Sequence, residues 1–164
     1  RRGLGIHALS AVDLALHDLA GRQLGLPAYK LLGGARRERL RPYCTVYPGV
    51  PREGWPVRRL MEETLRQFDR ALAAGFTAVK MEVIYGDAVT DDELVGLIRE
   101  GRAALPPATG FMLDFGYRWD HWRDAARVLS RLDDLDVHFA EACLRHDDLD
   151  GHRRLAGAAP MRVC

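Results

Sequence analysis

The stretch TAVKMEVIYGDAVTDDELVGLIREGRAALPPATGFMLDF, residues 77–115, decides the fold because it holds two apolar strands with one helix between them. The strands are predicted over 77–84 and 111–115. Between them, Thr90 or Asp91 is the predicted N-cap of a helix over 91–105, which two prolines end. Its inward positions recur at helical steps and are Leu94, Leu97, Ile98 and Leu105. The stretch therefore predicts a β-α-β unit with parallel strands.

The same alternation continues on both sides of this unit. Further strands are predicted over 42–47, 137–142 and 161–164, and further helices over 57–74, 121–132 and 148–156. This rhythm predicts an α/β protein with a parallel sheet, either an open doubly wound sheet or a (β/α) barrel. The sequence PGVPREG after the first strand lacks the glycine spacing of a dinucleotide-binding loop, which disfavours a dinucleotide fold. A separate helix is predicted over 7–24, with Gly25 as its stop.

The composition excludes several classes of partner. The 164 residues carry a formal net charge of +1, which gives no electrostatic basis for binding nucleic acid or an anionic membrane. Three widely spaced cysteines fit neither a disulfide framework nor a zinc motif, so a reducing, cytoplasmic location is expected. No apolar run approaches the roughly 20 residues of a membrane span. The absence of an initiator methionine favours a piece of a longer chain.

Charged residues mark the carboxyl ends of three successive predicted strands. Lys80 and Glu82 share one face of the strand over 77–84. Asp114 lies near the end of the strand over 111–115, and Glu141 near the end of the strand over 137–142. In a barrel these residues would converge in the active site. Converging carboxylates repel each other unless a positive charge lies among them, and carboxylate oxygens suit Mg²⁺. A set of buried ion pairs or exposed edge residues is the alternative, and the residues alone leave both open.

Four segments carry a resemblance to a known family. They are SAVDLALHDLAGRQLGLPAYKLLGG at 10–34, AVKMEV at 78–83, FMLDFGYRW at 111–119 and FAEACLRHDDLDGHRRLA at 139–156. In order and spacing they resemble the mandelate racemase/muconate lactonizing branch of the enolase superfamily. The resemblance implies a Mg²⁺-dependent enzyme with a modified TIM barrel that removes the proton α to a carboxylate. The metal and nearby cations would stabilise the enediolate, and a lysine or histidine would serve as base.

The resemblance also implies roles for individual residues. Asp114 matches the family's first metal ligand and Glu141 the second, while a third ligand is expected beyond Cys164. Lys80 matches the first lysine of the Lys-x-Lys pair, so Lys80 and Glu82 are the predicted catalytic positions. Glu82 stands where the second lysine is common, and two roles stay open for it. It would either pair with Lys80 and lower its reactivity, or act as a base itself.

Some further positions near the strand ends are less constrained. Gly116 stands where the family often has an asparagine two residues after the first ligand. Arg118 and His146 are candidate substrate-binding residues, since both follow metal-ligand strands; a surface ion pair and a solvated or capping histidine are the respective alternatives. Cys44 and Cys143 are interpreted as small apolar residues rather than nucleophiles.

The predicted organisation is a helical segment over 1–34 followed by the N-terminal half of a (β/α) barrel over 35–164. About four and a half βα units are present, fewer than a closed barrel needs. The chain is therefore expected to be a fragment that is inactive alone.

In the full-length enzyme, dehydration of an acid sugar or related hydroxy acid is the predicted reaction. A racemase or epimerase of a 2-hydroxy acid, or a catalytically silent subunit, is the alternative. A small carboxylate substrate and homo-oligomeric assembly are expected, with no nucleic-acid or membrane partner.

Overall fold

The computed structural model describes residues 3–164, which divide after Arg41 into two compact units. The N-terminal unit contains α1 (Leu4–Leu24) and the short α2 (Ala28–Leu31). Gly25 ends α1 with φ +64°, a left-handed conformation that a residue without Cβ adopts at little cost. The predicted stop at Gly25 is therefore confirmed. The predicted domain boundary between 34 and 35 stays a prediction.

The apolar side chains of α1 remain largely exposed. Leu9, Val12, Leu16 and Leu19, which recur at helical steps, each keep more than half of their surface accessible. Only Gly21 of this helix is buried, where it passes the backbone carbonyl of Leu26. The periodicity predicts the helix correctly but does not, within this unit, produce a buried face.

The second unit, Pro42–Cys164, is built on one parallel sheet in the order β1-β2-β3-β4-β5. The strands are β1 (Cys44–Val46), β2 (Ala78–Glu82), β3 (Gly110–Asp114), β4 (Val137–Glu141) and β5 (Arg162–Val163). The connecting helices are α3 (Val57–Ala73), α4 (Asp91–Ala103), α5 (Trp122–Leu129) and α6 (Leu149–Ala158), with 3₁₀ turns η1 (Gly86–Ala88) and η2 (Ser130–Leu135).

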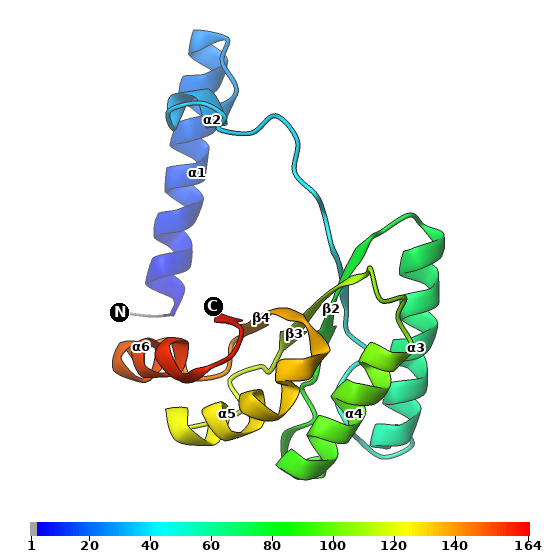
Figure 1. Cartoon of the computed structure of the whole chain (residues 1–164). Helices are drawn as coiled ribbons and strands as arrows, with labels where there is room; N and C mark the ends of the chain where they lie inside the picture. Colours follow the sequence, from blue (N-terminus) through cyan, green and yellow to red (C-terminus); the bar gives the residue numbers. More distant parts are fainter. Residues whose placement is uncertain (1–2) are drawn as a thin grey trace. The chain divides into compact units, whose positions relative to one another are not determined.

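The strand order decides between the two predicted architectures. A doubly wound sheet reverses its order at a switch point, whereas here every strand lies beside its successor in the sequence. Every connection is expected to be a right-handed crossover to the next strand in the same direction, which places all the connecting helices on the same face of the sheet. Figure 1 shows α3, α4, α5 and α6 following one another around the strands. The second unit is thus a partial (β/α) barrel, as predicted.

The core lies between the sheet and these helices. Val79, Met81 and Val83 point outward from β2 and its end, and each is fully buried. Phe111 and Leu113 do the same from β3. Helix α3 packs against β1 and β2 with its apolar side, of which Leu60, Met61, Thr64, Phe68 and Ala71 are buried. Since the outward face is occupied by apolar side chains, the alternate residues of each strand face the inside of the barrel.

Side-chain caps set the starts of α4 and α6. Thr90 is the N-cap of α4: its side chain accepts a hydrogen bond from the Glu93 N–H, and the Glu93 carboxylate accepts one from the Thr90 N–H. Asp148 caps α6 through the N–H of Gly151. The single helix predicted over 121–132 is wrong at its end, because α5 stops at Leu129 and continues as η2. Asp136 then turns the chain into β4 with φ +51°.

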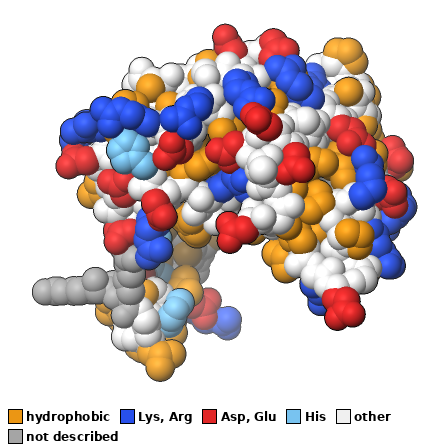
Figure 2. Space-filling view, turned by 90° about the horizontal axis from the view of Figure 1, so that it is seen from below, with side chains coloured by type: hydrophobic (Ala, Val, Ile, Leu, Met, Phe, Trp, Pro, Cys, Tyr) orange, Lys and Arg blue, Asp and Glu red, His pale blue; other side chains and the backbone are white. Residues whose placement is uncertain are grey.

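Charges of both signs are mixed over the surface of this unit. Ion pairs such as Arg99–Asp134, at 2.7 Å, join α4 to η2. On the face shown in Figure 2, basic and acidic side chains are interspersed. This distribution agrees with the near-neutral net charge. Among residues 3–164, no helix is long and apolar enough to cross a membrane.

Candidate metal centre

Three carboxylates form a row at the carboxyl ends of β2, β3 and β4. Glu82 lies opposite Asp114 in the β2–β3 register, and Asp114 lies opposite Glu141 in the β3–β4 register. Parallel strands that end at the same level bring these side chains to one edge of the sheet. The structure therefore assembles the acidic residues that the sequence selects.

A bulge in β4 sets this alignment. Phe111 is paired with Val137, but Leu113 is paired with Ala140, so β4 gains one residue over this interval. Without the extra residue, Asp114 would face Ala140 instead of Glu141. Bulges of this kind re-aim side chains at functional sites. The sequence alternation identifies the face of Glu141 but gives no sign of the bulge.

Lys80 lies between two of the three carboxylates. Its ammonium is 3.2 Å from Asp114 Oδ2 and 2.5 Å from Glu141 Oε2, and the residue is only 7% exposed. The ammonium also lies 5.9 Å from the centre of the Tyr43 ring. Glu82 has no hydrogen bond or ion pair with any residue of the described part of the chain, residues 3–164. The Lys80 ammonium thus forms ion pairs with Asp114 and Glu141, and Glu82 is left without an ion pair among residues 3–164.

This arrangement changes the titration of two groups. Burial acts to lower the pKa of Lys80, but its hydrogen bonds to Glu141 and Asp114 outweigh that effect and raise the pKa to about 12. Burial raises the pKa of Glu82, Asp114 raises it further, and Lys80 opposes both. Lys80 is therefore a fixed positive charge at neutral pH, and Glu82 is the carboxyl that holds a proton more readily than a free glutamate does.

The second oxygen of Asp114 is also held in place. Asp114 Oδ1 accepts a 3.1 Å hydrogen bond from the N–H of Gly116, which has φ +58°. A Cβ on Gly116 would lie 2.8 Å from Cγ1 of Ile84. Close contact with Ile84 and the left-handed conformation together explain a glycine at this position.

The donor set fits a magnesium ion in part. Mg²⁺ is commonly held by one or two carboxylates and completed by water and substrate oxygens. Asp114 and Glu141 provide two such groups, and the ammonium between them shows that the position favours positive charge. Among residues 3–164, no group of three or more His, Cys, Asp or Glu side chains is arranged to hold a metal. Two protein ligands are therefore what these residues offer.

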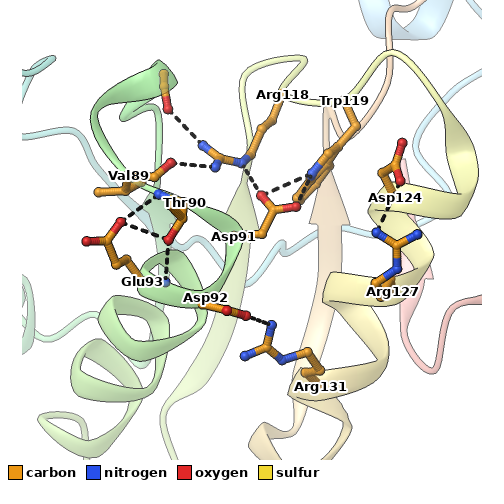
Figure 3. Close-up of polar contacts among 11 residues, drawn as sticks. Val89, Thr90, Asp91, Asp92, Glu93, Arg118, Trp119, Asp124, Arg127 and Arg131 are labelled. Atoms are coloured by element: carbon orange, nitrogen blue, oxygen red, sulfur yellow. Dashed lines mark hydrogen bonds and ion pairs between the residues drawn. The ribbon is translucent and has the colours of Figure 1, made fainter.

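Arg118 is bound by groups of η1 and the start of α4, as Figure 3 shows for Val89 and Asp91. Its Nε donates to Asp91 Oδ1 at 2.9 Å, and its two terminal nitrogens donate to the carbonyls of Gly86 and Val89. Trp119 Nε1 also donates to Asp91, at 3.2 Å. This geometry supports the ion-pair alternative for Arg118. The role of Asp91 was missed from the sequence, because its partners lie 27 and 28 positions further along the chain.

His146 lies near Glu141, in the loop after β4. Both residues line a pocket of about 280 Å³, together with Tyr117, Ala142, Leu144, His152 and Cys164. The exposed His146 ring lies edge to face against the Tyr117 ring, with 5.8 Å between the ring centres.

Burial raises the pKa of the Cys143 thiol to about 12, which opposes a thiolate nucleophile. The placement keeps His146 as a candidate and supports Cys143 as a small buried residue.

Two family profiles match this chain. "Enolase C-terminal domain-like" matches residues 63–164, and "Mandelate racemase / muconate lactonizing enzyme, N-terminal domain" matches residues 4–33. The chain belongs to the enolase superfamily. The predicted branch, mandelate racemase/muconate lactonizing enzymes, is confirmed. The row of three carboxylates, Glu82, Asp114 and Glu141, lies entirely within the first of these matches.

Known members of the superfamily are similar over almost the whole chain. D-gluconate dehydratase from Thermoproteus tenax is 31% identical over 95% of this chain, and 3,6-anhydro-alpha-L-galactonate cycloisomerase from Streptomyces coelicolor is 35% identical over 94%. These matches cover 31% and 39% of the two relatives, so the chain spans about a third of their length.

Solved structures agree with the observed fold. L-talarate/galactarate dehydratase from Salmonella typhimurium is 26% identical, with a TM-score of 0.74 over 93% of this chain and 35% of its own. A mutant of L-talarate/galactarate dehydratase has been solved with Mg and L-glucarate bound; it is 25% identical over 93% of this chain and 35% of its own, with a TM-score of 0.73. The relatives thus include acid-sugar dehydratases and a cycloisomerase.

Proposed function

We propose that the protein carrying this chain is a Mg²⁺-dependent enzyme that removes the proton α to the carboxylate of an acid sugar and then releases water. The observation that carries the proposal is the pairing of Asp114 with Glu141 across β3 and β4, with a cation already between them. The dehydratase relatives and the Mg- and glucarate-bound homologue support the reaction and the metal.

Asp114 and Glu141 are the proposed metal ligands. Bound Mg²⁺ would act as a Lewis acid that stabilises negative charge on substrate carboxylate oxygens. The two strand ends hold both carboxylates in register, and Gly116 fixes the rotation of Asp114. A third carboxylate ligand and a second base are proposed to come from residues other than those described.

Lys80 and Glu82 are the proposed catalytic residues on β2. Lys80 keeps its charge across the neutral range and would attract a substrate carboxylate to the strand ends. Glu82 is the residue on this strand suited to accept a proton, because it is half-buried and unpaired in the described part of the chain. A base role and a pairing with Lys80 therefore both remain candidate roles for Glu82, as in the sequence-based prediction. His146 is a proposed substrate contact through the pocket it shares with Glu141.

Isomerisation is the second candidate reaction. The cycloisomerase relative is 35% identical, more than the dehydratase from Thermoproteus tenax at 31%. Proton removal from the same carbon begins both reactions, so the residues of β2, β3 and β4 do not distinguish them. A catalytically silent subunit is the third candidate, favoured by the carboxylate at position 82 and the glycine at position 116.

A screen of acid sugars tests the proposal. The purified protein is incubated with aldonates and aldarates in the presence of Mg²⁺, and 2-keto acid products are measured with a carbonyl reagent. The expected result is a 2-keto acid from at least one substrate, abolished by EDTA and restored by Mg²⁺. An epimer without keto acid would indicate the racemase or epimerase, and a protein that binds Mg²⁺ without any turnover would indicate the silent subunit. The absence of turnover by the 164 residues alone stays a prediction.

A further inference from the structure

The charges at the strand ends do not balance. Three carboxylates, Glu82, Asp114 and Glu141, share one row. Among residues 3–164, Lys80 supplies the one cation bound to it, which leaves a formal charge of −2. The ammonium is bound to the two carboxylates that face each other on β3 and β4. It is not bound to Glu82, although Glu82 lies two residues away on the same face of β2. A divalent cation would bring the formal charge of this group to zero.

Lys80 and a metal ion would compete for the same oxygens. The ammonium lies 3.2 Å from Asp114 Oδ2 and 2.5 Å from Glu141 Oε2, so it occupies the space between the two proposed ligands. A divalent ion at that position would repel the ammonium, because both are positive and the side chains of Lys80 and Asp114 are only 9% and 14% exposed. The lysine would have to move, and its long flexible chain permits this.

Glu82 is the carboxylate that can bind the displaced ammonium of Lys80. Its carboxylate has no partner in residues 3–164, it lies opposite Asp114, and it projects from the same strand face as Lys80. A lysine that leaves Asp114 and Glu141 would exchange two carboxylates for one that is otherwise unpaired. Burial makes an unpaired carboxylate costly, so this pairing offsets part of the loss. The exchange therefore needs a carboxylate, and not a second lysine, at position 82.

We propose that Lys80 is the resident counter-ion of the metal site, which an entering divalent cation displaces from Asp114 and Glu141 onto Glu82. This inference rests on the proposed metal-binding function of Asp114 and Glu141, and it adds a determinant of metal affinity to it. Lys80 and Glu82 act together as an exchange pair: the first competes with the metal, and the second receives the competitor.

Calorimetric titration with Mg²⁺ measures the competition directly. Lys80→Met removes the competing cation and retains the length of the side chain, so the dissociation constant for Mg²⁺ should fall about tenfold. Lys80→Arg retains the charge and adds a planar group that binds carboxylates in a bidentate manner, so the dissociation constant should rise. An unchanged or higher dissociation constant in a folded Lys80→Met variant would overturn the proposal. If that variant does not fold, tighter binding by Lys80→Arg overturns it.

A double-mutant cycle tests the role of Glu82. Glu82→Gln removes the receiving carboxylate, so it should weaken Mg²⁺ binding about tenfold when Lys80 is present and much less in the Lys80→Met background. Equal weakening in both backgrounds would mean that Glu82 attracts the metal by itself and would contradict the exchange. Asp114→Asn is the reference: if it leaves Mg²⁺ affinity unchanged, the proposed metal site fails. If it weakens binding while Lys80→Met does not tighten it, only the exchange fails.

Discussion

The N–H of Gly116 donates a 3.1 Å hydrogen bond to Oδ1 of Asp114, and this contact fixes one oxygen of the carboxylate at the end of β3. Lys80 binds the other oxygen, Oδ2. Both oxygens of Asp114 are thus oriented by neighbours on the same barrel edge. Preorganised groups of this kind are typical of metal and catalytic sites, because little reorganisation is needed when a ligand binds.

Gly116→Ala should destabilise the fold. The new Cβ would lie 2.8 Å from Ile84 Cγ1, and the residue would keep a φ of +58°. We expect a loss of about 2–3 kcal/mol in the free energy of unfolding, measured by urea denaturation. Gly86→Ala is the matched control: φ is +55° there but nothing lies within 4 Å of the added Cβ, so about 1 kcal/mol is expected. Equal losses in the two variants would contradict a steric role for Ile84.

Asp114→Asn should remove metal-dependent activity. The amide retains the shape of the carboxylate but not its charge, so Mg²⁺ affinity should fall at least about a hundredfold. Calorimetric titration and turnover assays measure the two effects. Asp120→Asn changes an exposed acid in the loop that follows β3 and should leave both unchanged. Full activity of Asp114→Asn would refute the assigned ligand.

Asp91→Ala should loosen the loop after β3. This carboxylate accepts from Arg118 and from Trp119, both of which are largely buried, so its removal leaves two donors without a partner. We expect a loss of about 1–3 kcal/mol in the free energy of unfolding, together with faster amide hydrogen exchange in residues 115–119. Asp92→Ala, at the next position, removes only an exposed ion pair to Arg131 and should cost about 0.5 kcal/mol or less.

Acid should weaken helix α3 through Glu63. Hydrogen bonds from Arg66, Gln67 and Arg70 lower the pKa of Glu63 from 4.5 to about 2. Since the folded pKa lies below the unfolded one, this contribution is present above about pH 4.5 and is lost as the pH falls towards 2. Between pH 4.5 and 2 the free energy of unfolding should therefore fall less in Glu63→Gln than in the original protein. The difference should be no more than about 1 kcal/mol, because the arginines are exposed. Thermal unfolding followed across this pH range measures it.

Glu62→Gln is the control for this prediction. Glu62 is the preceding residue of the same helix, and its contact is a 3.7 Å ion pair with Arg58 in which both side chains are more than half exposed. Its replacement should leave the acid branch of the stability curve almost unchanged. A larger effect from Glu62 than from Glu63 would contradict the assignment.

The sequence by itself determined the order of the elements and the identity of the acidic row. Helix periodicity, the Thr90 cap and the glycine stop are local signals, and the alternation within β2 shows that Lys80 and Glu82 share one face. The resemblance selected Asp114 and Glu141, and the structure then placed them side by side.

Only the tertiary structure decided which of these groups interact. The bulge in β4 brings Glu141, and not Ala140, opposite Asp114, and no local residue pattern announces it. Asp91 contacts Arg118 and Trp119 across a separation that local propensity does not reach. Lys80 is two residues from Glu82 but binds carboxylates 34 and 61 positions away, because the sheet brings the ends of β3 and β4 within hydrogen-bonding distance of its ammonium.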